Sequence, residues 1–119
     1  MTPTELADKI CAYVRKEGMD YVSQAQLIAR FGDELRGDRL MEVPSKHLVL
    51  FVGCSQLFAD AVHIIEGESP QRVYLETCDY LVMLTDGCPV PLDMPTAKKV
   101  PKGGYKTNHF VPICFRPGP

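Results

Sequence analysis

The sequence predicts a single small α+β domain in which three helices precede a β-hairpin and an extended basic tail follows. Three observations predict it. Apolar residues recur at helical spacing through the first half of the chain, strand-like residues take over from Phe58, and prolines and glycines are frequent from Thr85 onward. At 119 residues and 45% hydrophobic, the chain has the size of one domain and can bury a core.

Helical periodicity predicts the first two helices, over about residues 4–17 and about residues 23–35. Thr4 and Ser23 are suitable N-caps, because their hydroxyl groups can accept a hydrogen bond from a free backbone N–H of the first turn. The apolar side chains that follow at helical spacing are Leu6, Ile10, Tyr13 and Val14 in the first helix and Ala25, Leu27, Ile28 and Phe31 in the second.

Residues 37–44 are expected to be a linker, because Pro44 disfavours helix at the residue before it. Ser45 can then cap a third helix over about residues 45–56, with Gly53 as a weak position inside it. The inner face of that helix should pack against the second helix. We therefore expect one buried group: Leu27, Phe31, Leu48 and Phe51.

From Phe58 the pattern favours strands, and we expect a hairpin over about residues 58–76. β-Branched and aromatic residues supply the first strand, residues 67–70 read as a turn, and residues 72–76 alternate like an antiparallel partner. The apolar run at residues 80–84 is expected to form a third strand, although periodicity alone does not separate strand from helix there.

The segment after the hairpin is too rich in proline and glycine for an ordinary helix. We expect residues 1–87 to form the domain and residues 88–119 to form an extended basic tail. The tail is either free or packed on the domain, where Phe110, Val111 and Ile113 could return as one edge strand.

Three helices followed by a hairpin is the element order of a winged helix, in which the hairpin is the wing. The apolar stretch 47–58 holds a Leu-x-x-Phe element, Leu48 to Phe51, and ends in the pair Leu57-Phe58, after which Val73-Tyr74-Leu75 returns. Over residues 4–76 this resembles the LOTUS domain, also called OST-HTH. The resemblance implies a role in RNA metabolism, notably in germline RNA regulation, where such domains bind RNA or dock on a DEAD-box RNA helicase.

Charge is divided unevenly along the chain. Residues 1–95 hold all 15 acidic residues and eight of the 13 basic ones, whereas the tail from Thr96 onward holds five basic residues and no acidic one. Lysines that can meet phosphates alternate there with aromatic rings that can stack on bases, as in proteins that bind single strands. The residues expected to contact single-stranded RNA are Lys98, Lys99, Lys102, Tyr105, Lys106, Phe110 and Arg116, together with Lys46 and His47 from the third helix.

Two alternatives stay open beside this hypothesis. The basic tail can instead fold back on the acidic body, with its aromatic residues in the core. The function can instead be protein docking, in which an acidic surface meets a basic partner such as an RNA helicase. That surface would comprise Asp33, Glu34, Asp38 and Glu42.

Neither an enzyme nor a metalloprotein is predicted. The three histidines are isolated, and no nucleophile or phosphate-loop motif accompanies them. The five cysteines lack paired ligand spacing, so no cofactor is expected, although Cys78, Cys88, His109 and Cys114 could still converge on zinc. Free thiols, the lack of a long apolar run and the lack of a signal-like N-terminus favour a cytoplasmic protein without a membrane partner.

Overall fold

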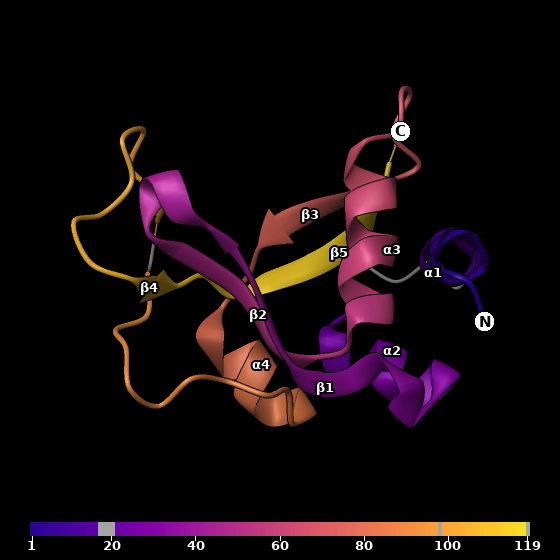
Figure 1. Cartoon of the computed structure of the whole chain (residues 1–119), viewed down its shortest axis with the longest axis horizontal. Coiled ribbons are helices and arrows are strands. Elements are labelled where there is room, and N and C mark those ends of the chain that lie inside the picture. The colour runs from indigo at the N-terminus through magenta and orange to yellow at the C-terminus, as the bar shows by residue number, and fades with distance from the viewer. Residues whose placement is uncertain (17–20, 98, 119) are drawn as a thin grey trace.

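The structure, a computed structural model, describes residues 1–16, 21–97 and 99–118 and shows a mixed α+β fold (Figure 1). Four α-helices and five strands are present in these residues. Short 3-10 turns at Asp33–Leu35 and Pro44–Lys46 flank the first strand. In chain order the elements are α1 (Pro3–Lys16), α2 (Gln24–Phe31), β1 (Arg36–Val43), β2 (Leu48–Cys54), α3 (Gln56–Glu66), β3 (Val73–Thr77), α4 (Tyr80–Asp86), β4 (His109–Phe110) and β5 (Ile113–Pro117).

The first two predicted helices are confirmed as α1 and α2. Ser23 caps α2 as expected, and its hydroxyl and the Gln26 side chain form a reciprocal capping box with each other's backbone N–H groups. The second helix ends earlier than predicted. Gly32, with φ of 101°, ends it after Phe31, because that left-handed conformation suits a residue without Cβ.

The expected linker at 37–44 and the expected helix at 45–56 are both wrong, because these residues form an antiparallel hairpin of β1 and β2. Met41 pairs with Phe51 and Val43 with Leu48, and the register shifts at three places along the pair. The hairpin explains the misleading pattern. The adjacent residues Leu48 and Val49 are buried in two different hydrophobic clusters, so β2 is covered on both faces and lacks the alternation of a half-exposed strand.

The expected hairpin at 58–76 is also wrong in its first half, which is helix α3. The Ser55 hydroxyl accepts a hydrogen bond from the Phe58 N–H (3.1 Å) and starts that helix. The second strand of that hairpin is confirmed as β3. The run at 80–84, expected to be a strand, is helix α4, which Asp79 caps and Gly87 ends in the left-handed conformation.

The C-terminal segment supplies two strands to the fold. β4 runs parallel to β2, and β5 pairs antiparallel with β3, in the register Leu75 to Phe115. On its other side β5 bridges Val22 through two backbone hydrogen bonds, Val22 N to Phe115 O (3.0 Å) and Phe115 N to Val22 O (2.8 Å). The segment therefore packs on the domain. The single edge strand expected around Phe110 and Ile113 is divided in two: β4 lies at the edge of the β1–β2–β4 sheet, and β5 pairs with β3.

Three phenylalanines from three elements form the centre of the core. Phe51 of β2 stacks on Phe115 of β5 (ring centroids 5.7 Å apart), and Phe58 of α3 meets both rings edge-on (5.3 and 6.3 Å). Leu27 and Leu48 are buried in the same core, as expected, and Phe31 is partly buried against it. A smaller cluster under α4 comprises Val49, Met83, Cys88, Phe110 and Cys114.

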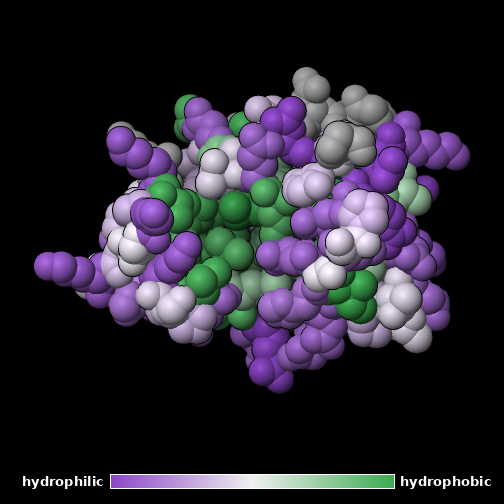
Figure 2. All heavy atoms as spheres, turned by 90° about the horizontal axis from the view of Figure 1, so that it is seen from above, coloured by the Kyte–Doolittle hydropathy of each residue, from purple (hydrophilic) through white to green (hydrophobic). Residues whose placement is uncertain are grey.

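The surface is mostly hydrophilic but not uniformly so. Figure 2 shows a hydrophobic hollow in the middle of the upper face, bordered by hydrophilic side chains. Large apolar side chains also stand exposed on and after α4, where Leu81 is 65% and Leu92 is 93% exposed. No helix within the described residues is long and apolar enough to cross a membrane.

Candidate nucleic-acid interface

The turn of the β1–β2 hairpin and the loop before β4 lie against each other at one end of the molecule (Figure 1). The Tyr105 N–H donates to Lys46 O, and the His109 N–H donates to His47 O, both at 2.9 Å. The His47 ring nitrogen Nδ1 donates to Tyr105 O at 2.8 Å. We name this surface the hairpin-tip patch; its members are Lys46, His47, Lys99, Lys102, Tyr105, Lys106 and His109.

Backbone conformation explains how these two segments come so close. His47 adopts the left-handed conformation, with φ of 55°, as the residue that ends the turn. Gly104 has φ of 76°, and a Cβ built there would lie 2.4 Å from Lys46 O. Only glycine combines that conformation with that approach, so Gly104 lets the loop dock on the hairpin.

The aromatic and imidazole rings of the patch are held in place. The Tyr105 ring stacks on the His109 ring, with centroids 3.7 Å apart and planes within 11°. The Tyr105 hydroxyl donates to Lys99 O, and His109 Nδ1 bonds Thr107 O (2.8 Å). Both rings are half-buried, so the pair presents a partly exposed, ordered edge to solvent.

The charge of the patch is positive and uncompensated locally. Lys46, His47, Lys99, Lys102 and Lys106 are all exposed. Among the described residues, the salt bridges involve Arg36, Arg72 and Arg116 and none of these four lysines. A cluster of cations without carboxylate partners is an electrostatic site for phosphate groups.

The structure therefore unites most of the predicted RNA contacts but separates two of them. Phe110 is 1% exposed and meets the Tyr80 ring edge-on at 6.3 Å, so it belongs to the core and cannot stack on a base. Arg116 lies on β5, where it bonds Glu76 (2.8 Å) and covers the Tyr21 ring. Lys98 lies outside the described residues.

The residues proposed for protein docking do not form one acidic face. Asp33 is 91% exposed and pairs with Arg36 at 3.2 Å. Glu34, Asp38 and Glu42 are also exposed, but Asp38 and Glu42 share β1 with the exposed cations Arg36 and Arg39. The surface is therefore of mixed charge, which weakens the electrostatic case for a basic partner.

A second basic surface, between α1 and α2, was missed in the sequence. It is a hollow of about 530 Å³ in which Arg30 lies over the rings of Tyr13 and Phe31 (5.9 and 5.7 Å). Lys9 and Lys16 line the same hollow. Helical spacing was the available signal, since residues 9, 13 and 16 fall on one face of α1.

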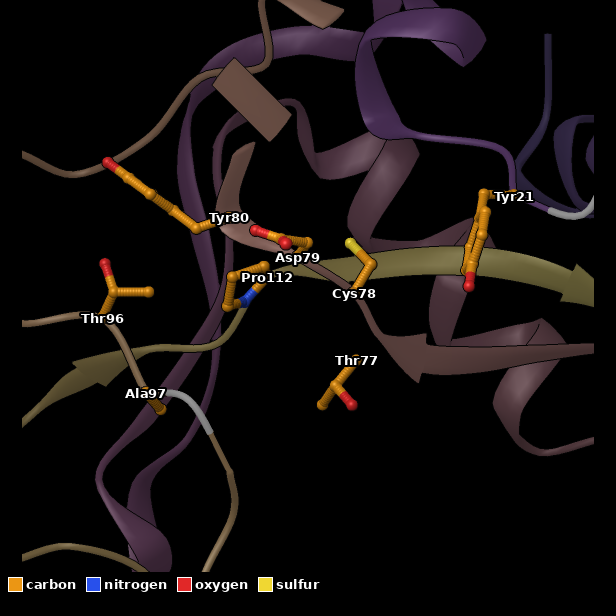
Figure 3. Close-up of a pocket in the computed structure, with 8 residues that line it drawn as sticks. All are labelled: Tyr21, Thr77, Cys78, Asp79, Tyr80, Thr96, Ala97 and Pro112. Atoms are coloured by element: carbon orange, nitrogen blue, oxygen red, sulfur yellow. The ribbon is translucent and has the colours of Figure 1, made fainter. Parts of the chain in front are cut away.

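A half-open cleft of about 600 Å³ lies between the end of the β3–β5 pair and the strand-like segment around Thr96. Figure 3 shows Tyr21 and Tyr80 on opposite sides of Cys78, with Asp79 beside it. Asp79 is engaged as the cap of α4, and burial raises the pKa of the Cys78 thiol. The other lining residues are Thr77, Thr96, Ala97 and Pro112.

The cysteines and histidines do not converge on a metal site within the part of the chain that the structure describes. Cys78 and Cys114 are in contact, and Cys88 belongs to the same cluster as Cys114. His109, however, is held in the hairpin-tip patch by Tyr105 and Thr107. Of the four residues considered for zinc, the three cysteines thus lie near α4, whereas His109 lies in the hairpin-tip patch.

No protein-family model, curated protein or solved structure matches this chain. Its function therefore has to be inferred from the geometry of these surfaces, of which the hairpin-tip patch is the one that brings cations and ordered rings together.

Proposed function

We propose that this protein is a non-catalytic binding module of RNA metabolism that contacts single-stranded RNA through the hairpin-tip patch. The observation that carries the proposal is the docking of the 99–109 loop on the hairpin turn through Tyr105 and His109. That contact assembles four exposed lysines around a stacked ring pair, from two segments far apart in sequence. Phosphates can meet the lysines while a base meets the ring edge.

We further propose that the fold is a winged helix with two insertions. Helices α1, α2 and α3 would be its three helices, and β5, flanked by Val22 and β3, its small sheet. The β1–β2 hairpin would then be inserted between the second and third helices, and residues 78–112 would extend the wing. A relation to LOTUS domains is part of this proposal, with Val73-Tyr74-Leu75 as the returning strand after α3.

In this assignment α3, rather than the predicted 45–56 segment, takes the place of the recognition helix. Its exposed side chains include Gln56, His63 and Glu66, with Asp60 half-exposed. Such a helix face offers no arginine or lysine for base edges or phosphates, which duplex binding needs in number. The geometry therefore supports single strands rather than duplex DNA.

The direct test is fluorescence anisotropy of a labelled single-stranded RNA titrated with the whole chain at several salt concentrations. Four phosphate contacts at about 0.7 each give a log–log salt slope of roughly −2.8. Replacing Lys99, Lys102 and Lys106 with alanine should leave only the contact from Lys46 and reduce the slope to about −0.7. Duplex DNA of equal length should bind more weakly.

A matched control removes three cations elsewhere: Lys9→Ala, Lys16→Ala and Arg30→Ala in the hollow between α1 and α2. This variant has the same net charge as the patch variant and should keep the original slope. Equal losses in the two variants would mean that net charge alone attracts RNA. Absence of binding at low salt would reject the RNA proposal. A pull-down that captures a helicase regardless of ribonuclease treatment would then favour docking.

A further inference from the structure

Two cysteine side chains meet at the end of the β3–β5 pair. Cys114 lies on β5 opposite Glu76, and Cys78 directly follows β3, where its N–H donates to Pro112 O at 3.0 Å. Their sulfur atoms are 2.8 Å apart. A disulfide bond is about 2.05 Å long, so a shift of under about 1 Å would join them.

The two thiols differ in access. Cys114 is fully buried, whereas Cys78 is half-exposed and lines the cleft between Tyr21 and Tyr80 (Figure 3). A small oxidant that enters the cleft can therefore reach Cys78 and not Cys114. The neighbouring sulfur of Met83, 3.8 Å from Cys78, accepts the thiol hydrogen.

We propose that Cys78 and Cys114 are a peroxide-oxidisable pair, in which Cys78 reacts first and Cys114 resolves it as a disulfide. The Cys78 sulfur attacks one peroxide oxygen, the O–O bond breaks, and water leaves with Cys78 as a sulfenic acid. The Cys114 sulfur then attacks that sulfur, the S–O bond breaks, and a second water leaves with the Cys114 proton. Two thiols lose two electrons in all, and one hydrogen peroxide becomes two waters.

The disulfide would join β5 to Cys78, the residue that precedes Asp79, the cap of α4. It would therefore fix one wall of the cleft and close a covalent loop from residue 78 to residue 114. A loop of that size lowers the entropy of the unfolded chain, and the melting temperature of the oxidised protein should rise by roughly 5–15 °C.

Burial sets the speed of the reaction. It raises the pKa of both thiols, so only a small fraction is thiolate at neutral pH. Because the thiolate is the nucleophile, the rate of oxidation should rise about tenfold per pH unit between pH 7 and 8.5. A pH-independent rate would mean that the pair does not react through Cys78 in its buried setting.

The experiment treats the whole chain with hydrogen peroxide and maps it by mass spectrometry without reduction. The expected product is about 2 Da lighter and joins the tryptic peptide 73–98 to the peptide 107–119. Because Cys88 shares the first peptide, the Cys88→Ser variant identifies the partner, and it should give the same link. In Cys114→Ser, dimedone should trap the sulfenic acid on Cys78.

Two controls keep the test decisive. Cys11→Ser removes a buried thiol on α1 and should leave the Cys78–Cys114 link unchanged. If Cys114→Ser does not fold, Cys78→Ala, which should abolish the link, serves in its place. Three results would each overturn the proposal. Cys78 could be converted to sulfinic acid without a disulfide, the disulfide could require Cys88, or the chain could stay unmodified. RNA binding by the reduced protein is measured separately, so the two proposals fail independently.

Discussion

Replacing Phe115 of β5 with alanine should destabilise the protein severely. Its side chain is fully buried, its ring stacks on Phe51 and meets Phe58, and its backbone bonds Val22 on both the donor and the acceptor side. The substitution keeps the backbone bonds and removes the ring, so it isolates the packing contribution.

The expected cost follows from these contacts. A buried Phe→Ala change costs about 3–5 kcal/mol of unfolding free energy. The cost should lie in the upper half of that range, because Phe51 and Phe58 also pack on each other. Neither ring can move into the cavity left by Phe115 without losing its contact with the other. A 119-residue chain has an unfolding free energy of roughly 6–18 kcal/mol, so the variant loses a large share of it.

Urea denaturation followed by circular dichroism measures this loss. With a slope of about 2 kcal/mol per molar, a loss of 4 kcal/mol lowers the midpoint by about 2 M. Tyr74→Ala is the matched control, because Tyr74 lies on the partner strand β3 and is 40% exposed; it should cost less than about 1 kcal/mol. A Phe115→Ala midpoint within about 0.5 M of wild type would refute the packing described around β5.

Three further predictions concern the tail, the patch and an ion pair. Truncation after residue 95 should unfold the protein, because it removes β4 and β5; a folded product by circular dichroism would contradict this. Gly104→Ala should weaken RNA binding without changing any charge, because the new Cβ would collide with Lys46 O. If this variant binds RNA as tightly as wild type in the anisotropy titration, RNA binding does not depend on the docking of the loop. The Arg72 guanidinium bonds Glu68 and holds the pKa of that carboxyl below its ordinary value of 4.5. The stabilisation from this pair is therefore complete at pH values above 4.5 and is lost as the pH falls through the lowered pKa. Glu68→Gln should reduce the melting temperature at pH 7, and its difference from wild type should shrink as the pH is lowered below 4.5.

The failure to predict β2 has a specific cause. Strands are recognised by alternation when one face is exposed, but Val49 packs into the cluster under α4 while the adjacent Leu48 packs into the main core. A continuous apolar run results, and such a run fits a strand or a buried helix equally well. The charged partner strand β1 offers almost no strand signal, so the hairpin depends on tertiary packing.

The errors at α3 and α4 were avoidable, because the caps were visible in the sequence. Ser55 and Asp79 stand one residue before their helices, and Gly87 stands after α4. Val62, Ile64 and Ile65 favour strand by residue type. The helical spacing of the buried residues of this stretch decides the structure instead; they include Phe58, Ala59, Val62 and Ile65.

The candidate site was predictable in composition but not in arrangement. The lysines and Tyr105 were identifiable because the tail has no acidic residue. Lys46 and His47 were named for the wrong reason, as exposed positions on a helix. They belong to the patch because the hairpin turn meets residues more than fifty positions away, and no local signal encodes that contact.

The bridge between Val22 and Phe115 has a consequence for synthesis on the ribosome. Since β5 pairs with both Val22 and β3 and adds Phe115 to the core, the apolar faces of α1, α2 and the hairpin stay uncovered until residues 113–117 have left the ribosome. Contacts between distant parts of the sequence also form slowly. The nascent chain should therefore need chaperone protection until that point, and a chain that stops just before β5 should be degraded.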